Sequence, residues 1–202
     1  MNWLSPRKIP WVAHPDAFLS RYLNLPDGRK INFSPPQQER LKASGAELCL
    51  VRSPSHLGGN LILVTGEVER STDFEKGLPN AFAVREGKTE HDPILDDQAL
   101  VLQVRGKGLV VISGCAHAGI INTVRYARKV TGMDRVYAVI GGFHLTGPQF
   151  EPLIDRTIQE LKEISPEMII PMHCTGWKTI QRIGAELPDS FVPSCVGTKI
   201  NL

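Results

Sequence analysis

The sequence predicts a layered α/β fold, on three observations. In the second half of the chain, strand-like apolar runs alternate with helix-like segments. Three of these runs end in small residues followed by a histidine, at His117, His144 and His173. The first half consists mainly of short strand-like runs. A chain that is rich in strands early and alternates strand and helix later is typical of sheet and helix layers rather than of a bundle or a pure β sandwich.

The elements of the first half are expected in the following order. A short apolar run, Ile9–Ala13, is followed by a helix that extends through Tyr22. Leu25–Gly28 is predicted to be a turn, because proline fixes one backbone angle and glycine accepts the next. Ser34, which precedes two prolines, is expected to be the N-cap of a helix that Gly45 ends.

The middle of the chain contains further strands and one long loop. Strand-like runs occur at Leu48–Val51 and Leu61–Thr65. The charged segment Gly66–Glu90 has no hydrophobic period and is expected to be an irregular loop, and loops of this length are often functional. The apolar runs Gln98–Val104 and Leu109–Ser113 flank a short glycine-containing segment, which indicates a β-hairpin.

Three helices are expected after this hairpin, because apolar residues recur there every three or four positions. Their apolar faces are Ile120, Val124 and Ala127 in the first, Ile154, Ile158 and Leu161 in the second, and Trp177, Ile180 and Ile183 in the third. Each helix follows one of the apolar runs that end in histidine. The three histidines therefore stand about one strand-helix unit apart.

Side chains just past the ends of neighbouring strands converge on one edge of an α/β sheet, where ligands usually bind. Neutral imidazole is a common ligand of first-row metal ions, and three ligands with an open position describe a catalytic site. A single histidine is more often a hydrogen-bonded strand cap. Three histidines in the same recurring context favour metal binding over three separate strand caps. His117, His144 and His173 are therefore the predicted metal ligands.

Neighbouring residues supply candidates for a supporting role. Cys115 and Cys174 each lie within two residues of a candidate ligand, and thiolates are zinc ligands or nucleophiles, although free cysteine is often simply buried. Asp92 and Asp97 precede the hairpin and are read equally well as solvated turn residues or as carboxylates that orient a ligating imidazole. Arg70, in the long loop, is a candidate phosphate contact. No residue is indicated as the catalytic group.

The composition describes one globular domain, residues 1–202. Its 202 residues, 42% of them hydrophobic, suffice for a sizeable core. A net charge of +2 with dispersed basic residues gives no indication of nucleic acid or of an anionic membrane, and leaves a small anionic substrate open. No apolar run approaches the roughly 18–20 residues that cross a bilayer. Four cysteines without a CxxC pair, and a start without an apolar run, predict a reduced, cytoplasmic protein.

The ordered motifs Ser-Gly-Cys-Ala-His117-Ala-Gly, Gly-Gly-Phe-His144 and His173-Cys-Thr-Gly resemble the metallo-β-lactamase-fold superfamily. The subgroup that they resemble is that of the dihydropterin–ribofuranosylaminobenzene phosphate synthases. This resemblance implies an αββα sandwich with metal ions that activate water for attack on an ester, amide or phosphate-type bond. It also implies that His117 and His173 are metal ligands and that His144 is a ligand or a substrate contact. Zinc is the expected divalent metal, with iron, manganese and magnesium as alternatives.

The superfamily's hallmark His-x-His-x-Asp-His is absent, because no two histidines here are separated by one residue. In relatives the segment resembling Pro10–Phe18 follows soon after that hallmark. The expectation is therefore a single domain that is incomplete at its N-terminus, and that self-associates or pairs with a complementary N-terminal segment.

The function expected from these observations is that of a metal-dependent hydrolase, or of a related pterin or phosphate-ester transferase, acting on a small, phosphate-bearing molecule. The rival is a non-catalytic, truncated or degenerate domain that binds a partner or a small anionic ligand. The missing hallmark supports this rival, and the three strand-end histidines oppose it. A nucleotide-binding domain ranks lower because no Gly-x-Gly-x-x-Gly follows a strand. A Cys/His hydrolase ranks lowest, since it requires Cys115 or Cys174 to be exposed beside a histidine.

Overall fold

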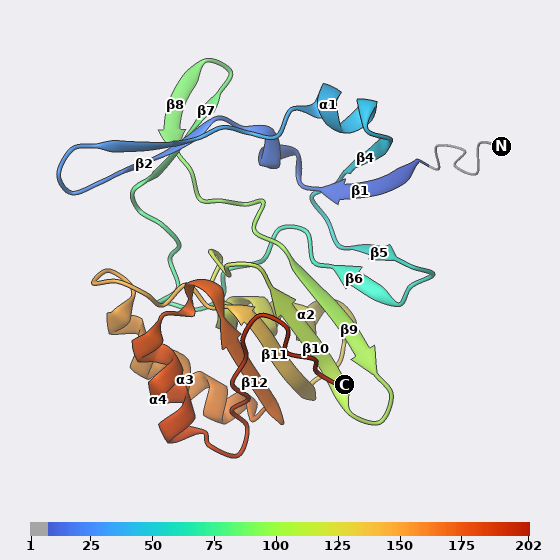
Figure 1. Cartoon of the computed structure of the whole chain (residues 1–202), viewed down its shortest axis with the longest axis vertical. Helices are drawn as coiled ribbons and strands as arrows, with labels where there is room; N and C mark the ends of the chain where they lie inside the picture. The colour runs from blue at the N-terminus through green and yellow to red at the C-terminus, as the bar shows by residue number, and fades with distance from the viewer. Residues whose placement is uncertain (1–7) are drawn as a thin grey trace. The chain divides into compact units, whose positions relative to one another are not determined.

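A computed structural model describes residues 8–202 and divides them into two compact units. Among the described residues, the first unit comprises 8–53 and 78–96, and the second comprises 54–77 and 97–202 (Figure 1). The first seven residues, on which the expectation of a start without an apolar run rests, lie outside the described part. Within residues 8–202, no helix has the length and apolarity needed to cross a membrane.

The first unit consists of short strands and one short helix. β1 (Ile9–Ala13) pairs in parallel with β4 (Ala46–Leu50), and α1 (Gln38–Ala43) precedes β4. An antiparallel sheet has the strand order β3-β2-β7-β8. Its strands are β2 (Arg21–Asn24), β3 (Lys30–Phe33), β7 (Ala81–Arg85) and β8 (Lys88–His91).

Buried ion pairs hold this unit together. Arg21, the first residue of β2, donates to Asp92 over 2.5 Å and binds Asp96 through both of its terminal nitrogens. Asp92 is completely buried, so the arginine compensates a charge that would otherwise be costly. Arg85 pairs in the same way with the buried carboxylate of Asp16, at 2.7 Å.

Three predictions for the first part of the chain are wrong. The helix through Tyr22 is only a 3₁₀ turn, Pro15–Phe18, in which the His14 ring accepts a hydrogen bond from the Asp16 backbone. Ser34 caps no helix, because α1 begins four residues later without a side-chain cap. The predicted irregular loop Gly66–Glu90 contains the strand β7 and the start of β8. The buried residues of β7 are two small alanines, Ala81 and Ala83, and β8 is exposed, so neither strand has a strong apolar period.

The second unit contains a six-stranded sheet in the order β12-β11-β10-β9-β6-β5. Its strands are β5 (Ser55–Leu57), β6 (Ile62–Val64), β9 (Ala99–Val104), β10 (Gly108–Ser113), β11 (Val136–Gly142) and β12 (Met168–Met172). β9 and β10 form the predicted hairpin, while β10, β11 and β12 run parallel to one another. The carboxyl ends of three adjacent strands therefore lie at one edge of this sheet.

The three predicted helices are present, and all of them pack on one face of this sheet. They are α2 (Ile120–Thr131), α3 (Ile154–Ile164) and α4 (Trp177–Glu186). The predicted apolar faces of α2 and α3 form one core with Leu109 and Val111 of β10, whereas Val110 points to the opposite face. For α4 the prediction holds only at Ile183, because Trp177 is exposed and Ile180 is not part of this core. On the opposite face the C-terminal segment, through Val192 and Ile200, packs against the sheet, and Figure 1 shows this segment running across the strands.

The N-terminus of α2 is held by a carboxyl group that is distant in sequence. Glu75 accepts hydrogen bonds from the backbone N–H groups of Ile121 and Asn122, at 3.0 and 2.7 Å. Burial raises the pKa of Glu75 to about 7. A Cβ at Gly119, whose φ is +101°, would lie 2.2 Å from the Glu75 carboxyl carbon, so the segment before α2 can pass this side chain only as glycine. Glu75 thus fixes the loop that carries His117.

The end of β11 is crowded in a similar way. A Cβ at Gly142 would lie 2.5 Å from the carbonyl oxygen of Gly114 and 2.8 Å from the Sγ atom of Cys174. At the preceding residue, Gly141, a Cβ would lie 2.1 Å from the carbonyl oxygen of Ser113. The loops after β10 and β12 therefore approach the end of β11 more closely than any side chain there would allow.

We expect the buried Glu75 to make the stability of the fold depend on pH. The folded chain keeps the Glu75 proton up to about pH 7, whereas the unfolded chain loses it near pH 4.5. Between these values the folded state binds more protons, so the free energy of unfolding falls as pH rises. A tenfold difference in proton affinity corresponds to about 1.4 kcal/mol, and the full effect is about 3 kcal/mol. Urea denaturation of wild type and Glu75→Gln at pH 4.5 and 7.5 measures it, and an equal pH response in both proteins would contradict it.

We expect Gly142→Ala to lower the free energy of unfolding by about 1–3 kcal/mol, the usual cost of overpacking. Gly114→Ala is the matched control, because nothing lies within 4 Å of a Cβ at that position and its φ is not positive. The control is expected to stay within about 0.5 kcal/mol of wild type. Denaturant titration measures the free energy of unfolding of the two variants. A similar decrease in both would show that the neighbouring loops do not approach Gly142 closely.

Candidate functional site

The three histidines follow β10, β11 and β12 in the chain, His117 and His144 in loops and His173 at the start of a 3₁₀ turn, His173–Thr175. Figure 1 shows these three strands side by side. The rings of His117 and His144 are in edge-to-face contact, with centroids 4.7 Å apart. His173 Nε2 lies 3.2 Å from the Sγ atom of Cys115, which is on the same loop as His117. Side chains from all three loops therefore meet at the carboxyl edge of the sheet.

The backbone of these loops adopts conformations that are unfavourable for residues with side chains. Ala116, His144 and His173 have φ values of +53°, +49° and +52°. Each such residue costs about 1–3 kcal/mol, and such residues are concentrated at functional sites. The sequence carries no signal for this feature, because positive φ is normally inferred from glycine or asparagine.

His144 is held between two rings. Its imidazole contacts the ring of Phe150, at a centroid distance of 4.6 Å, as well as that of His117. Burial lowers the pKa of His144, which favours the neutral ring. Its Nδ1 atom is buried and has no hydrogen-bond partner among the described residues. A neutral imidazole with a free nitrogen is the form that binds a metal or accepts a proton.

Cys115 and Cys174 form a coupled pair of thiols beside His173. The hydrogen bond between the two sulfurs raises the pKa of Cys115 to about 12 and lowers the pKa of Cys174 to about 7. The Sγ atom of Cys174 also lies 3.5 Å from the carbonyl oxygen of Cys115 and donates to it.

The two cysteines and His173 have the geometry of a metal-binding group. Within residues 8–202, one group of three His, Cys, Asp or Glu side chains has all of its donor atoms within 4.8 Å of one another, namely Cys115, His173 and Cys174. Tetrahedral zinc with bonds of about 2.0–2.3 Å places its donors roughly 3.5–3.8 Å apart, so these residues fit such an ion after small movements. His117 and His144 lie beside this group and are not part of it. Their assignment as ligands stays a prediction.

The charged residues that the sequence suggested, Asp97, Asp92 and Arg70, lie in different parts of the structure. Asp97 accepts a hydrogen bond from the Ala118 backbone at 2.9 Å, and its other oxygen lies 3.8 Å from Nδ1 of His117. It therefore steadies the loop that carries His117. Asp92 belongs to the first unit, where it is paired with Arg21. The Arg70 guanidinium lies against Gly77, 2.9 Å from where a Cβ would be.

Glu75 was not among the sequence candidates, and it changes the interpretation of the glycine-flanked segment around His117. Glycines on both sides of a histidine could let backbone N–H groups approach a bound anion closely. Glu75 and Asp97 already accept hydrogen bonds from the backbone N–H groups of Ala118, Ile121 and Asn122. The first turn of α2 is thus occupied by carboxylates of the chain itself.

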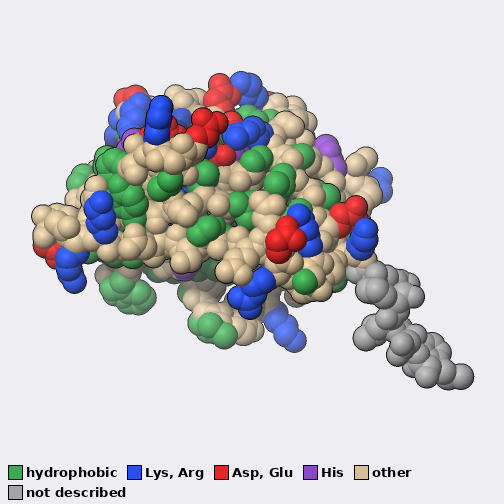
Figure 2. All heavy atoms as spheres, turned by 90° about the horizontal axis from the view of Figure 1, so that it is seen from above, with side chains coloured by type: hydrophobic (Ala, Val, Ile, Leu, Met, Phe, Trp, Pro, Cys, Tyr) green, Lys and Arg blue, Asp and Glu red, His purple; other side chains and the backbone are tan. Residues whose placement is uncertain are grey.

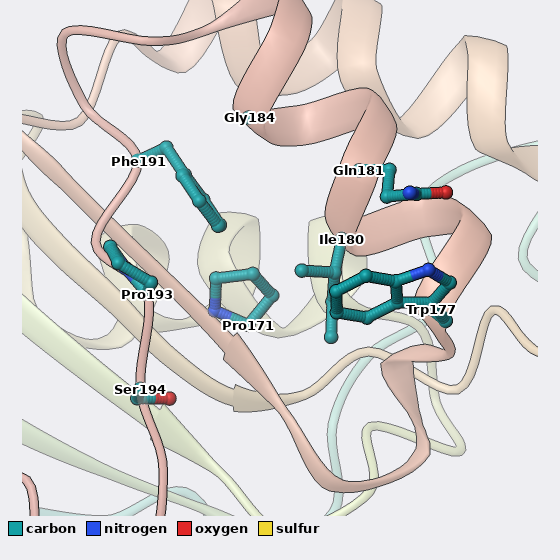
Figure 3. Close-up of a pocket in the computed structure, with 8 residues that line it drawn as sticks. All are labelled: Pro171, Trp177, Ile180, Gln181, Gly184, Phe191, Pro193 and Ser194. Carbon is teal, nitrogen blue, oxygen red and sulfur yellow. The ribbon is translucent and has the colours of Figure 1, made fainter.

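An apolar hollow of about 580 Å³ lies beside β12 and α4 (Figure 3). Trp177, with 72% of its surface exposed, and Ile180 line one side, and Phe191 and Pro193 line the other. The polar side chains in its lining are Gln181 and Ser194, with no imidazole, thiol or carboxylate. Its chemistry therefore differs from that of the histidine edge.

Surface charge is mixed. On the face of the molecule shown in Figure 2, basic and acidic side chains are interspersed. In the second unit they form pairs such as Arg125 with Glu160 and Lys178 with Glu151, at 2.6 and 2.8 Å. This distribution agrees with the small net charge of the chain.

Comparison with known proteins gives two relatives from Methanocaldococcus jannaschii. The first, 7,8-dihydropterin-6-methyl-4-(beta-D-ribofuranosyl)-aminobenzene-5'-phosphate synthase, is 32% identical over 192 residues, which cover 92% of this chain and 63% of the relative. The second, an uncharacterized protein, is 32% identical over 191 residues, 95% of this chain and 67% of that protein. The chain thus spans less than two thirds of the length of the named relative. No family model matches the chain.

The fold is similar to that of a solved structure, a metal-dependent hydrolase of the β-lactamase superfamily. The TM-score is 0.80 at 23% sequence identity, over 97% of this chain and 72% of the other. This confirms the predicted fold class. Together with the two sequence relatives, it shows that the chain belongs to the metallo-β-lactamase-fold superfamily, in the subgroup that contains the named M. jannaschii synthase.

Proposed function

We propose that the chain carries the metal-binding edge of an enzyme that transfers a group of a small, phosphate-bearing molecule, with hydrolysis as transfer to water. The observation that supports this proposal most is the meeting of three loops at one sheet edge, where the His117 and His144 rings touch and His173 contacts Cys115. The phosphate and the pterin in the name of the M. jannaschii relative support this substrate class.

In this proposal His117, His144 and His173 face the reacting molecule, and the last of them holds a divalent metal ion. When bound, such an ion polarises a substrate oxygen and stabilises the negative charge that develops there. Asp97 keeps the His117 loop in place through its hydrogen bond to the Ala118 backbone. The buried Nδ1 of His144, which has no hydrogen-bond partner within residues 8–202, is available to a metal or to a substrate proton.

The surroundings of the histidines favour this chemistry. Phe150 packs edge-to-face against the His144 ring, which is partly buried. His173 is exposed, so a small molecule can reach it from solvent. A partly buried site with one exposed ligand strengthens the interaction of a cation with a substrate oxyanion.

We expect His173→Ala to weaken the binding of a divalent metal at least about tenfold, because the substitution removes an imidazole that coordinates the metal directly. His56→Ala is the control, because His56 is an exposed histidine on β5. Elemental analysis after dialysis against a fixed metal concentration gives the metal content of each protein. Hydrolysis of a chromogenic phosphodiester, with and without a chelator, gives the activity. Equal metal content in wild type and His173→Ala would refute the role of His173.

A further inference from the structure

The geometry points to Cys115, Cys174 and His173 as a binding site for a thiophilic metal ion such as Zn²⁺, Cd²⁺ or Cu⁺, rather than for Mg²⁺ or Mn²⁺. Two sulfurs and one imidazole nitrogen lie within 4.8 Å of one another. Soft thiolate ligands select zinc and copper(I), whereas magnesium and manganese favour oxygen ligands. This inference shares His173 with the proposed function but does not require the chain to be catalytic.

The fold brings the two cysteines together from distant parts of the second unit. Cys115 follows β10 and Cys174 follows β12, and β11 lies between these strands. The absence of a side chain at Gly142 makes their approach possible, because a Cβ there would lie 2.8 Å from Cys174 Sγ and 3.3 Å from Cys115 Cα. The space for both sulfurs is therefore built into the strand between them.

The burial of the three residues suits an ion with an open coordination position. Both cysteines are partly buried, whereas His173 is exposed. Three protein ligands leave the fourth position of a tetrahedral ion free for water or substrate. The His117 ring contacts that of His144 and belongs to the loop that carries Cys115, so both imidazoles border the site without being needed to hold the ion.

Charge is balanced in the bound form. As each metal–sulfur bond forms, the corresponding thiol proton passes to solvent, and the oxidation state of the metal does not change. Two thiolates and a neutral imidazole around Zn²⁺ give a complex without net charge. Such a complex is tolerated in a partly buried position at lower cost than a bare dication.

The first test uses the wild-type protein, so it does not depend on a variant that folds. The reduced chain is treated with iodoacetamide with and without Zn²⁺, and alkylation of each cysteine is followed by peptide mass spectrometry. We expect Zn²⁺ to slow alkylation of Cys115 and Cys174 at least tenfold, while Cys49 and Cys195 react unchanged. Mg²⁺ should protect none of them. Equal alkylation of Cys115 and Cys174 with and without Zn²⁺ overturns the inference.

The second test identifies the donors with Co²⁺, whose bonds to thiolate sulfur give an intense charge-transfer band in the near ultraviolet. We expect this band in wild type and in the control Cys195→Ser, which replaces an exposed cysteine. It should be lost from Cys115→Ser and from Cys174→Ser. A band that persists in both of these variants overturns the inference.

The variant His117→Ala separates this inference from the proposed function. The cobalt band should persist in it, because His117 is not among the three donors, whereas phosphodiester hydrolysis should fall. Loss of the cobalt band from this variant, with its fold intact by circular dichroism, contradicts the three-donor site and leaves the proposed function standing. A retained band with unchanged hydrolysis supports the site and contradicts the role proposed for His117.

Discussion

The site depends on the close approach of three parallel strands at their carboxyl ends. β10, β11 and β12 each end in a short loop, and the glycines at the end of β11 let the other two loops close over it. A side chain at Gly142 would collide with the Gly114 carbonyl and with the Cys174 sulfur at the same time. This one constraint explains why imidazoles and thiols that are far apart in the sequence lie within a few ångströms of one another.

The loops themselves are held in costly conformations, and buried interactions around them compensate. His144 and His173 both have positive φ, which their side chains disfavour. Glu75 accepts two backbone hydrogen bonds at the start of α2, and Asp97 accepts one from Ala118. Because these carboxyl groups satisfy backbone donors near His117, the N–H groups of Ala118, Ile121 and Asn122 are not available to an anion from solvent.

The sequence predicts the second unit well because the periodic spacing of apolar residues determines its helices and strands. The three helices and the β9-β10 hairpin follow from it directly, and so does the position of the histidines past strand ends. The first unit is predicted poorly, since its strands are short and two of them, β3 and β8, are exposed throughout. They are also ordered by ion pairs such as Arg21 with Asp92, which no local sequence pattern reveals. For the site, the sequence names the histidines. The grouping of Cys115 with Cys174 and the role of Glu75 depend on which backbones approach, and this is a property of the fold.

The most direct test of the account is anomalous diffraction at the zinc absorption edge, on crystals of the protein grown with stoichiometric Zn²⁺. The account predicts one strong anomalous peak at the carboxyl edge of β10, β11 and β12. That peak should lie about 2.3 Å from both the Cys115 and Cys174 sulfurs and about 2.0 Å from His173 Nε2. A peak elsewhere in the protein, or none at full zinc occupancy in solution, would contradict the account.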